Sequence, residues 1–334
     1  MLPALAARWN ESVVAHAAAK YGVRPSDLER LAGFENFVFE ADGGASGWIL
    51  RISHSMRRTA DYTMGEVQWV TSLAAAGLPV AGVLRSRHGN LVEIVAPDEE
   101  GYFVATAFER APGVLLDDAP AIRRACWAPD LFEQWGDLLA RLHLHARRFT
   151  PSAPAYRRQQ WFEYDVLDGE RWLPPNEVRV REVCQQARRA VESLPRHADA
   201  YGLIHADLTQ RNFCYGDGRI TAFDFDNCEY GWFVRDLAVA IYYVALDLPD
   251  DERNEGTSEF AGHLLRGYGA RRTLERSWLE ALPRFLRLQR VMNYVLAAQL
   301  NEREPTPEQR DQLRRRRELI EADEPVVGVD FARL

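Results

Sequence analysis

Lysine is almost absent from this chain of 334 residues. Lys20 is the single lysine, so arginine supplies nearly all of the 41 basic side chains. A buried cation, or a cation that binds phosphate, therefore has to be a guanidinium group almost everywhere in the chain. Histidine is also scarce, with 8 residues scattered along the sequence, which disfavours a metal site built mainly from histidines.

The sequence is equally poor in cysteine and in long apolar runs. No two of the 4 cysteines have the C-x-x-C spacing, which argues against a disulfide framework and against a structural zinc site. No run approaches the roughly 18 apolar residues of a membrane-spanning helix. Residues 1–10 are apolar but lack a basic start, so we expect no secretory signal and place the protein in the cytoplasm.

An excess of positive charge is missing as well. The 41 basic and 49 acidic residues give a net charge of -8, and the pI is about 5.6. Because sequence-independent binding to nucleic acid relies on a basic surface, we expect no nucleic-acid partner. The apolar content of 47% and the charged content of 27% are those of a globular protein, and the length allows one large domain or two moderate ones.

The first third of the chain has the pattern of a small β-rich domain. Residues 3–20 are predicted to form a helix, and residues 28–94 contain short apolar or alternating runs that predict strands. A second helix is predicted over residues 63–77, where a glycine precedes a proline. A last strand-like stretch, residues 101–109, leads to the turn at Pro112-Gly113.

The remaining two thirds are rich in helix patterns. Residues 150–160 read as a surface connection, and residues 201–227 interrupt the helices with two short apolar runs around a Gly-Asp-Gly turn. Strands followed by helices predict an α+β fold with two lobes, residues 1–110 and 111–334, and a ligand cleft at their junction. Helices are expected over residues 129–146, 176–193, 236–247, 258–269, 275–302 and 307–322.

The densest group of polar residues lies between positions 205 and 236, among aliphatic and aromatic side chains. Asp224 follows the apolar run Ile220–Phe223, which predicts a carboxylate at the end of a buried strand. Such a carboxylate is normally paired, hydrogen-bonded or bound to a metal. Oxygen ligands from asparagine and aspartate suit Mg²⁺. The group consists of His205, Asp207, Asn212, Asp224, Asp226, Glu229 and Asp236.

The spacing within this group is that of a kinase catalytic loop followed by a metal-binding aspartate. The loop pattern is His205-x-Asp207-x-x-x-x-Asn212, and Asp224 follows it. In such a site Asp207 would orient the substrate hydroxyl, while Asn212 and Asp224 would hold Mg²⁺. The turn at Gly216-Asp217-Gly218 would let the two short strands fold back, so that the two metal ligands converge.

The segment that begins with GLIHADLTQRNF and continues through ITAFDFDNCEYGWFVRDLAVAIYY resembles the aminoglycoside phosphotransferase and choline kinase-like superfamily. Within this superfamily it looks most like homoserine kinase type II and related bacterial small-molecule kinases. The resemblance extends in outline over residues 28–300 and implies the two-lobed protein-kinase-like fold. The first lobe would then bind the nucleotide, and the second would carry the catalytic loop, the metal site and the substrate-binding helices.

The resemblance assigns further roles around the catalytic loop. His205 matches a residue that braces the loop, and Asp236 matches an aspartate that anchors the loop from behind. Asp226 matches a second acidic position, with a role in binding metal or water. His143 matches a position frequent in the family, and we expect it to be a packing histidine.

The nucleotide site implied by the resemblance begins at a reduced glycine loop. Gly33 to Phe37, with Asn36 between them, would cover the ATP phosphates through backbone N–H groups. The stretch from Ala107 to Glu109 resembles the hinge between the lobes, whose backbone would hydrogen-bond the adenine.

The cation for the nucleotide phosphates, usually a lysine on the third strand, has to be an arginine in this chain. Lys20 precedes the glycine loop in the first predicted helix and is therefore excluded. Arg51 is the basic residue embedded in an apolar strand at the right position, and such a buried guanidinium needs a partner or an anion. Glu66, on the following helix, is its expected ion-pair partner.

We therefore expect a phosphotransferase that uses ATP and Mg²⁺ to phosphorylate a hydroxyl of a small molecule. An amino alcohol, a homoserine-like amino acid or an aminoglycoside would be suitable acceptors. Asp226 and Glu229 would favour an acceptor that carries an amine. The sequence does not identify the acceptor, does not separate ATP from GTP, and leaves the oligomeric state open.

Other functions are compatible with parts of the pattern. A Ser/Thr protein kinase of the bacterial stress-response type would keep the fold, but the short segment between Gly231 and Asp236 favours a small substrate. A metal-dependent phosphoesterase would leave the β-rich lobe unexplained. A nucleotide-binding module without turnover conflicts with the presence of Asp207, Asn212 and Asp224 together.

Overall fold

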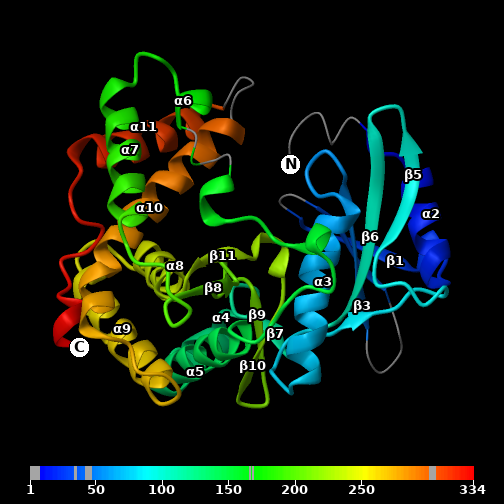
Figure 1. Cartoon of the computed structure of the whole chain (residues 1–334), viewed down its shortest axis with the longest axis horizontal. Coiled ribbons are helices and arrows are strands. Elements are labelled where there is room, and N and C mark those ends of the chain that lie inside the picture. The colour runs from blue at the N-terminus through cyan, green and yellow to red at the C-terminus, as the bar shows by residue number, and fades with distance from the viewer. Residues whose placement is uncertain (1–7, 34–35, 42–46, 165–166, 168, 301–305) are drawn as a thin grey trace. The chain divides into compact units, whose positions relative to one another are not determined.

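The chain is a mixed α+β protein, as the sequence predicted, and its computed structural model divides into two compact units (Figure 1). The structure describes residues 8–33, 36–41, 47–164, 167, 169–300 and 306–334. Unit 1 contains residues 1–113, 149–158 and 221–226, and unit 2 contains residues 114–148, 159–220 and 227–334. Within the described ranges, no helix is both long and apolar enough to cross a membrane.

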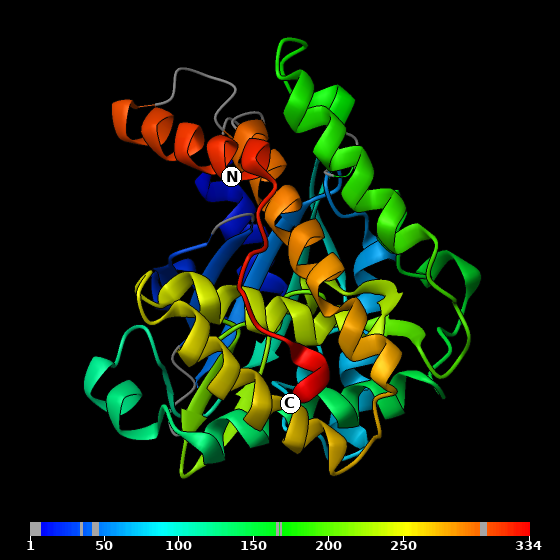
Figure 2. The same cartoon turned by 90° about the vertical axis from the view of Figure 1, so that its left-hand side faces the viewer.

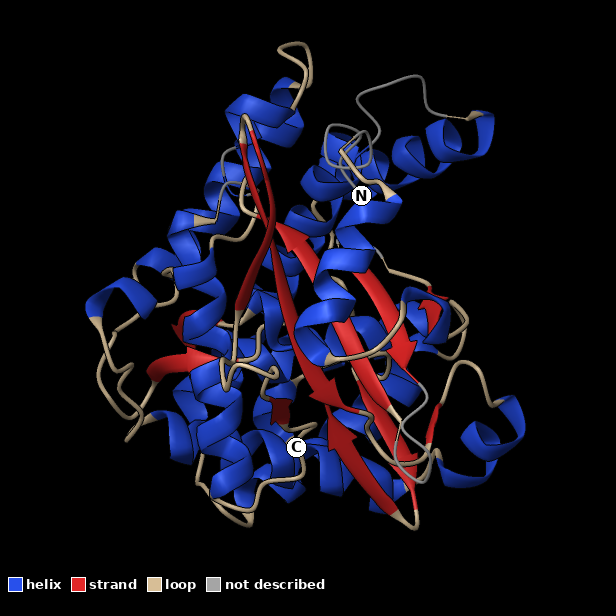
Figure 3. Cartoon of the chain, turned by 90° about the vertical axis from the view of Figure 1, so that its right-hand side faces the viewer, coloured by secondary structure: helices blue, strands red, loops and turns tan. Residues whose placement is uncertain are grey.

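Unit 1 is built on a six-stranded antiparallel sheet, drawn in red in Figure 3. Five strands follow the order β1-β2-β3-β6-β4, and β5 also pairs with β6. On β3, Arg51 lies opposite Val38 of β2 and Thr106 of β6, so it stands in the interior of the sheet. The strands are β1 (Leu28–Leu31), β2 (Phe37–Ala41), β3 (Trp48–His54), β4 (Val83–Leu84), β5 (Glu93–Asp98) and β6 (Gly101–Glu109).

The two long helices of unit 1 start at capping residues that the sequence supplies. α2 (Glu11–Tyr21) begins after Asn10, whose side chain accepts hydrogen bonds from the first backbone N–H groups, and ends at Gly22, which has a left-handed φ of 77°. α3 (Ala60–Ala75) begins after Thr59, which caps it in the same way. The first helix was predicted over residues 3–20. Residues 3–7 lie outside the described part of the chain.

The core of unit 1 lies between α2 and the sheet. Side chains on one face of the helix pack against aromatic and aliphatic residues of the central strands, which removes their apolar surface from water. Strand β2 alternates between buried and half-buried residues, as the sequence pattern predicted, whereas β3 and β6 contain continuous buried runs. The core residues are Val13, Ala17, Phe37, Phe39, Leu50, Ile52, Val95, Phe103 and Ala105.

Unit 2 is mostly helical (Figure 2), and its long helices agree with the predicted ranges. α9 begins at Arg253, five residues before the predicted start. The prediction missed this first part because its residues are polar and show no apolar periodicity. In Figure 2 the C-terminal segment, in red, runs beside α10 and ends near α9. The helices are α4 (Pro120–Cys126), α5 (Pro129–Ala146), α6 (Gly169–Trp172), α7 (Val178–Glu192), α8 (Phe233–Asp247), α9 (Arg253–Gly269), α10 (Arg276–Leu300) and α11 (Pro307–Ala322).

Short strands carry the segment that contains the predicted catalytic loop. The Gly-Asp-Gly turn joins two of them, and both Asp217 and Gly218 have left-handed φ values, as a two-residue hairpin turn requires. One small sheet contains β7 (Val114–Leu115), β9 (Phe213–Gly216) and β10 (Arg219–Ala222). A second pairs β8 (Tyr201–Ile204) with β11 (Glu229–Trp232) in antiparallel register.

Helices α5 and α9 approach each other closely at two glycines. A Cβ atom on Gly136 would lie 2.0 Å from the carbonyl oxygen of Leu264, and a Cβ atom on Gly267 would lie 2.0 Å from that of Glu133. Both neighbours are backbone atoms, which cannot move aside as a flexible side chain can. The two glycines therefore set the distance between the helices.

We expect Gly136→Ala to destabilise the protein by about 1–3 kcal/mol, because the added methyl group would force α5 and α9 apart. The measurement is the free energy of unfolding from urea denaturation. Gly262→Ala is the matched control within α9, since a Cβ atom at Gly262 meets nothing within 4 Å. This control should gain about 0.5–1 kcal/mol from helix propensity. Equal effects of the two substitutions would contradict the close approach.

Candidate active site

The predicted catalytic loop of unit 2 starts directly after β8 and is held by one buried carboxylate. Asp236, in the first turn of α8, accepts hydrogen bonds from the backbone N–H of His205 (3.0 Å) and from that of Ala206 (2.7 Å). Ala206 has a φ of 67°, a left-handed conformation that costs energy for a residue other than glycine. Asp236 thus anchors the loop from behind, as the resemblance implied.

His143 of α5 completes the surroundings of Asp236. Its Nε2 lies 3.0 Å from Asp236 Oδ2 and its Nδ1 lies 3.0 Å from the hydroxyl of Tyr268. The expectation of a packing histidine is confirmed, because the side chain is fully buried against the rings of Phe233 and Tyr268, and the structure adds a polar partner at each ring nitrogen. Burial lowers the pKa of His143 despite the neighbouring carboxylate. Burial alone would raise the pKa of Asp236, but the hydrogen bond from His143 holds it below its usual value.

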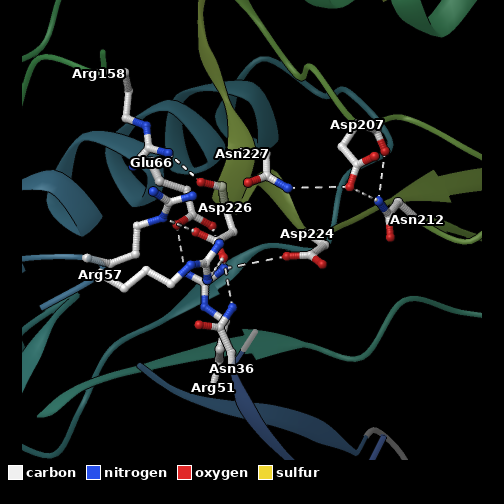
Figure 4. A network of polar contacts seen from close by, with 11 residues as sticks. Asn36, Arg51, Arg57, Glu66, Arg158, Asp207, Asn212, Asp224, Asp226 and Asn227 are labelled. Carbon is white, nitrogen blue, oxygen red and sulfur yellow. Dashed lines mark hydrogen bonds and ion pairs between the residues drawn. The ribbon is translucent and has the colours of Figure 1, made fainter. Parts of the chain in front are cut away.

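Asp207 is oriented by its neighbours in the loop (Figure 4). Asn212 donates through Nδ2 to the carbonyl oxygen of Asp207 at 2.7 Å and to its Oδ2 at 3.1 Å. His205 Nδ1 accepts from the backbone N–H of Asp207 at 3.3 Å, which gives this buried histidine the bracing position that the resemblance implied. Asn227, which the sequence analysis missed, donates to Asp207 Oδ2 at 3.4 Å. Asn227 directly follows Asp224-Phe225-Asp226, and this position was the sequence signal that could have identified it as a site residue.

In unit 1, Arg51 of β3 and Glu66 of α3 form the ion pair that the sequence predicted. Arg51 Nη1 lies 2.8 Å from Glu66 Oε1, and Nη2 lies 2.6 Å from Oε2, so the contact is bidentate. Both side chains are buried, and the guanidinium group lies over the ring of Phe108. Burial alone would lower the pKa of Arg51, but the charge of Glu66 holds it above its usual value.

Asp224 follows β10 and lies near the same guanidinium group. Its Oδ1 is 3.7 Å from Arg51 Nη1, and 46% of its side chain is exposed. Its φ of 60° is left-handed, a conformation that aspartate tolerates better than most residues. Two backbone hydrogen bonds fix the preceding strand within unit 1, since Ala222 donates to Pro79 and accepts from Ala81.

Asp226 is surrounded by donors of unit 1 (Figure 4). Arg58 Nε lies 2.8 Å from Oδ1, while Asn36 Nδ2 (2.8 Å) and Arg57 Nη1 (3.3 Å) lie close to Oδ2. Burial would raise the pKa of Asp226, but these cations hold it well below its usual value. The sequence analysis did not find these arginines. The local signal that could have pointed to them was two consecutive arginines, Arg57 and Arg58, shortly after a predicted strand.

Arg158 corrects a further expectation. It lies in the segment 150–160, which the sequence suggested to be a surface connection, yet it is 2% exposed. Its guanidinium group donates to the backbone carbonyl of Asp226 and to that of Tyr62, and lies over the ring of Tyr62. The correction applies to Arg158 alone, because the other residues of this segment are exposed or half-buried, as a surface connection requires.

The remaining residues predicted to bind nucleotide lie in the loop and on β6. Gly33 has a clear reason to be glycine, because a Cβ atom there would lie 2.3 Å from the carbonyl oxygen of Asn36. Residues 34 and 35 of this loop lie outside the described part. Ala107 pairs with residues of β3 and β4, and the backbone N–H of Glu109 donates to the carbonyl of Gly82 at 2.8 Å. Their role toward adenine stays a prediction.

The chemistry of the predicted site residues suits the two groups that the sequence implied, Mg²⁺ and ATP. Asp224 offers an accessible carboxylate and Asn212 an amide, which are the oxygen ligands that Mg²⁺ prefers. Arg51 offers a fixed guanidinium group, which suits the phosphates of ATP.

We expect Glu66→Gln to cost about 3–5 kcal/mol of unfolding free energy, because it leaves Arg51 buried without its anionic partner. Urea denaturation measures this loss. Glu40→Gln is the matched control, since Glu40 pairs with Arg110 at 2.9 Å on the surface. The control should cost less than about 1 kcal/mol. Comparable losses in the two variants would contradict the stabilising role of the buried pair.

We expect the unfolding free energy to fall on acidification below about pH 6.5, because His143 binds a proton more readily in the unfolded chain than in the folded one. His143→Gln should flatten the slope between about pH 5 and 6.5 by up to about 1.4 kcal/mol per pH unit. Urea denaturation across this range measures the slope. His88→Gln, at an exposed turn, is the control that should keep it. Parallel slopes for wild type and His143→Gln would refute the assignment.

Comparison with known proteins tests the predicted family and activity independently of the site geometry. A model of the phosphotransferase enzyme family matches residues 27–282. Amicoumacin kinase of Bacillus subtilis (strain 168) is 35% identical to this chain over 327 residues, which cover 97% of the chain and 96% of that protein.

Solved structures of kinases share the fold of this chain. Amicoumacin kinase hAmiN, in complex with AMP-PNP, Ca²⁺ and Ami, is 33% identical with a TM-score of 0.90, and 98% of each chain is covered. A microcompartment-associated aminopropanol kinase shares the fold at 24% identity with a TM-score of 0.74, over 94% of this chain and 96% of the other.

These similarities confirm the fold class and the small-molecule kinase activity predicted from the sequence, and they do not favour the Ser/Thr protein kinase alternative. Two relatives above 30% identity that span nearly the whole chain are amicoumacin kinases. The chain therefore belongs to the phosphotransferase enzyme family, as a phosphotransferase that uses ATP and a divalent metal and has an alcohol group as acceptor.

Proposed function

We propose that this chain transfers the γ-phosphoryl group of ATP, with Mg²⁺ as the metal, to a hydroxyl of amicoumacin or of a closely similar small molecule. The observation that carries this proposal is the similarity to amicoumacin kinase along nearly the whole length of both chains. We also propose that the reaction takes place in the cytoplasm, because ATP is the phosphoryl donor.

In this proposal, unit 2 supplies the groups that act on the acceptor. Asp207 orients the acceptor hydroxyl and accepts its proton as the phosphoryl group is transferred. His205 acts through Asp207, because it contacts the backbone of this residue and is itself buried. Asn212 serves both as the partner that orients Asp207 and as a metal ligand.

Unit 1 supplies the groups that act on the nucleotide. Arg51, oriented by Glu66, binds the phosphates, and Asp224 is the second metal ligand. The loop from Gly33 to Phe37 covers the phosphates through its backbone N–H groups, and the backbone from Ala107 to Glu109 contacts the adenine. When bound, Mg²⁺ neutralises negative charge on the phosphoryl oxygens. Catalysis then comes from positioning and electrostatic stabilisation.

The structure removes one argument for the nature of the acceptor. Asp226 and Glu229 suggested an acceptor with an amine, but each carboxylate already has a guanidinium partner. Asp226 is paired with Arg57 and Arg58, and Glu229 forms a buried ion pair with Arg235. These two acids therefore provide no uncompensated negative charge, and the acceptor is proposed from the relatives alone.

The test is an acceptor panel with purified chain, ATP and Mg²⁺. Amicoumacin, aminopropanol and hydroxylysine are offered separately, together with a serine-containing protein. We expect phosphorylated amicoumacin, identified by mass spectrometry, to form with the highest kcat/KM of the panel. Transfer to the protein alone would overturn the proposal in favour of a protein kinase.

Asp207→Asn should lower kcat about 10²- to 10⁴-fold, because it removes the group that accepts the hydroxyl proton. The thermal shift produced by Mg·ATP should persist in this variant, since Asp207 is not assigned to the nucleotide. Steady-state kinetics and thermal unfolding measure the two effects. A kcat close to that of wild type would show that Asp207 is not the proton acceptor.

A further inference from the structure

Asp226 lies only two residues after Asp224, but the two carboxylates have different surroundings. Both oxygens of Asp226 are engaged, by Arg58 at Oδ1 and by Asn36 and Arg57 at Oδ2, and its side chain is 7% exposed. Asp224 has one guanidinium group within 4 Å among the described residues, that of Arg51 at 3.7 Å, and its side chain is 46% exposed.

These surroundings make Asp226 a poor ligand for a cation. A divalent metal needs a free oxygen lone pair and a negative potential. At Asp226 two guanidinium groups compensate the single negative charge, and the charge of Arg51 adds to them. A metal at this carboxylate would lie beside the guanidinium groups of Arg57 and Arg58, whose positive charges repel it. Asp224 is more exposed and lies farther from its guanidinium neighbour, so its carboxylate can accept a cation.

Asp226 instead connects segments that are distant in the sequence but all belong to unit 1. Asn36 closes the glycine loop, Arg57 and Arg58 follow β3, and Arg158 binds the backbone of Asp226 itself. On the other side, Asp224 is joined to Asp226 through Phe225, which packs against Trp69 of α3. Asp226 therefore links the side chain of Asn36 to the segment that carries Asp224.

The contact with Asn36 is the critical one. Asn36 is 8% exposed, and its Oδ1 is buried without a hydrogen-bond partner within the described structure. The bond from Nδ2 to Asp226 is therefore the polar contact that orients this side chain. The backbone pairing of β2 with β3 holds the chain from Phe37 onward, whereas the side chain of Asn36 depends on the carboxylate for its orientation.

We propose that Asp226 is a positioning residue and not a metal ligand: it holds Asn36 of the glycine loop in register with Asp224, so that nucleotide affinity depends on it and cation affinity does not. This inference rests on the proposed function, because it presumes that the glycine loop binds the nucleotide phosphates.

The test separates nucleotide binding from cation binding in Asp226→Asn and Asp224→Asn. Isothermal titration calorimetry with ADP in the presence of EDTA measures nucleotide affinity without metal. A Mg²⁺ titration of the activity at saturating ATP gives the cation midpoint. Asp226→Asn should weaken ADP binding about tenfold, the effect of losing one charge-assisted hydrogen bond, and leave the Mg²⁺ midpoint within about twofold. Asp224→Asn should shift the Mg²⁺ midpoint at least about tenfold.

Two further variants keep the test decisive. Asp226→Glu retains the charge that Arg57 and Arg58 need but displaces the contact with Asn36, so it should weaken ADP binding even if Asp226→Asn does not fold. Glu93→Gln is the matched control, because Glu93 is a buried carboxylate of the same unit with partners at Ser86 and Asn90. It should change neither ADP affinity nor the Mg²⁺ midpoint.

The opposite pattern overturns the inference. If either substitution of Asp226 raises the Mg²⁺ midpoint as Asp224→Asn does, while ADP affinity in EDTA stays at the wild-type value, Asp226 is a metal ligand. If wild type binds no nucleotide with or without Mg²⁺, the proposed function fails, and the inference fails with it.

Discussion

The predicted catalytic loop depends on the hydrogen bonds that its backbone donates to the buried carboxylate of Asp236. A carboxylate without solvent costs several kcal/mol unless its oxygens are hydrogen-bonded. Here the donors are two consecutive backbone N–H groups of the loop and the imidazole of His143. The position of Asp236 in the first turn of α8 adds the favourable end of the helix dipole. The strained backbone at Ala206 persists because this carboxylate accepts hydrogen bonds from the N–H groups of both Ala206 and the preceding His205.

Unit 1 shows how a chain with one lysine builds a buried network of charges. A guanidinium group has donors in several directions within one plane, whereas an ammonium group acts as a point charge. Arg51 uses this geometry to bind Glu66 through two hydrogen bonds while Nη1 still faces Asp224. Asp226 likewise receives Arg57 and Arg58 at different oxygens. Arginine therefore permits a denser network of buried charges than lysine would.

The sequence predicted those features that rest on local patterns. Periodicity placed the helices, and the Asp217-Gly218 pair placed the hairpin, because both depend on residues close together in the chain. The ion pair of Arg51 with Glu66 could be predicted for the same reason, since these residues lie on a strand and on the helix that follows it in the chain. The resemblance to a family supplied the role of Asp236.

The features that the sequence missed depend on distant residues. Arg58 and Asp226 are 168 positions apart, and no local pattern links them. Arg158 lies in a proline-containing segment that looks like a surface loop, and only the fold shows that it enters the interior. His143 fits an amphipathic helix equally well as an apolar or a hydrogen-bonded residue. The approach of α5 to α9 at Gly136 and Gly267 likewise requires knowledge of which helices are neighbours.

The single lysine has a consequence for chemical labelling. Lys20 lies in the last turn of α2, 3.3 Å from Glu93 of β5, and its side chain is 34% exposed. Amine-directed acylation of side chains can therefore modify one position only, on the face of unit 1 formed by α2 and β5. The cation expected beside the nucleotide phosphates is Arg51, whose guanidinium group stays protonated and does not act as a nucleophile. Acylating nucleotide probes that detect kinases through a phosphate-site lysine would therefore leave this enzyme unmarked.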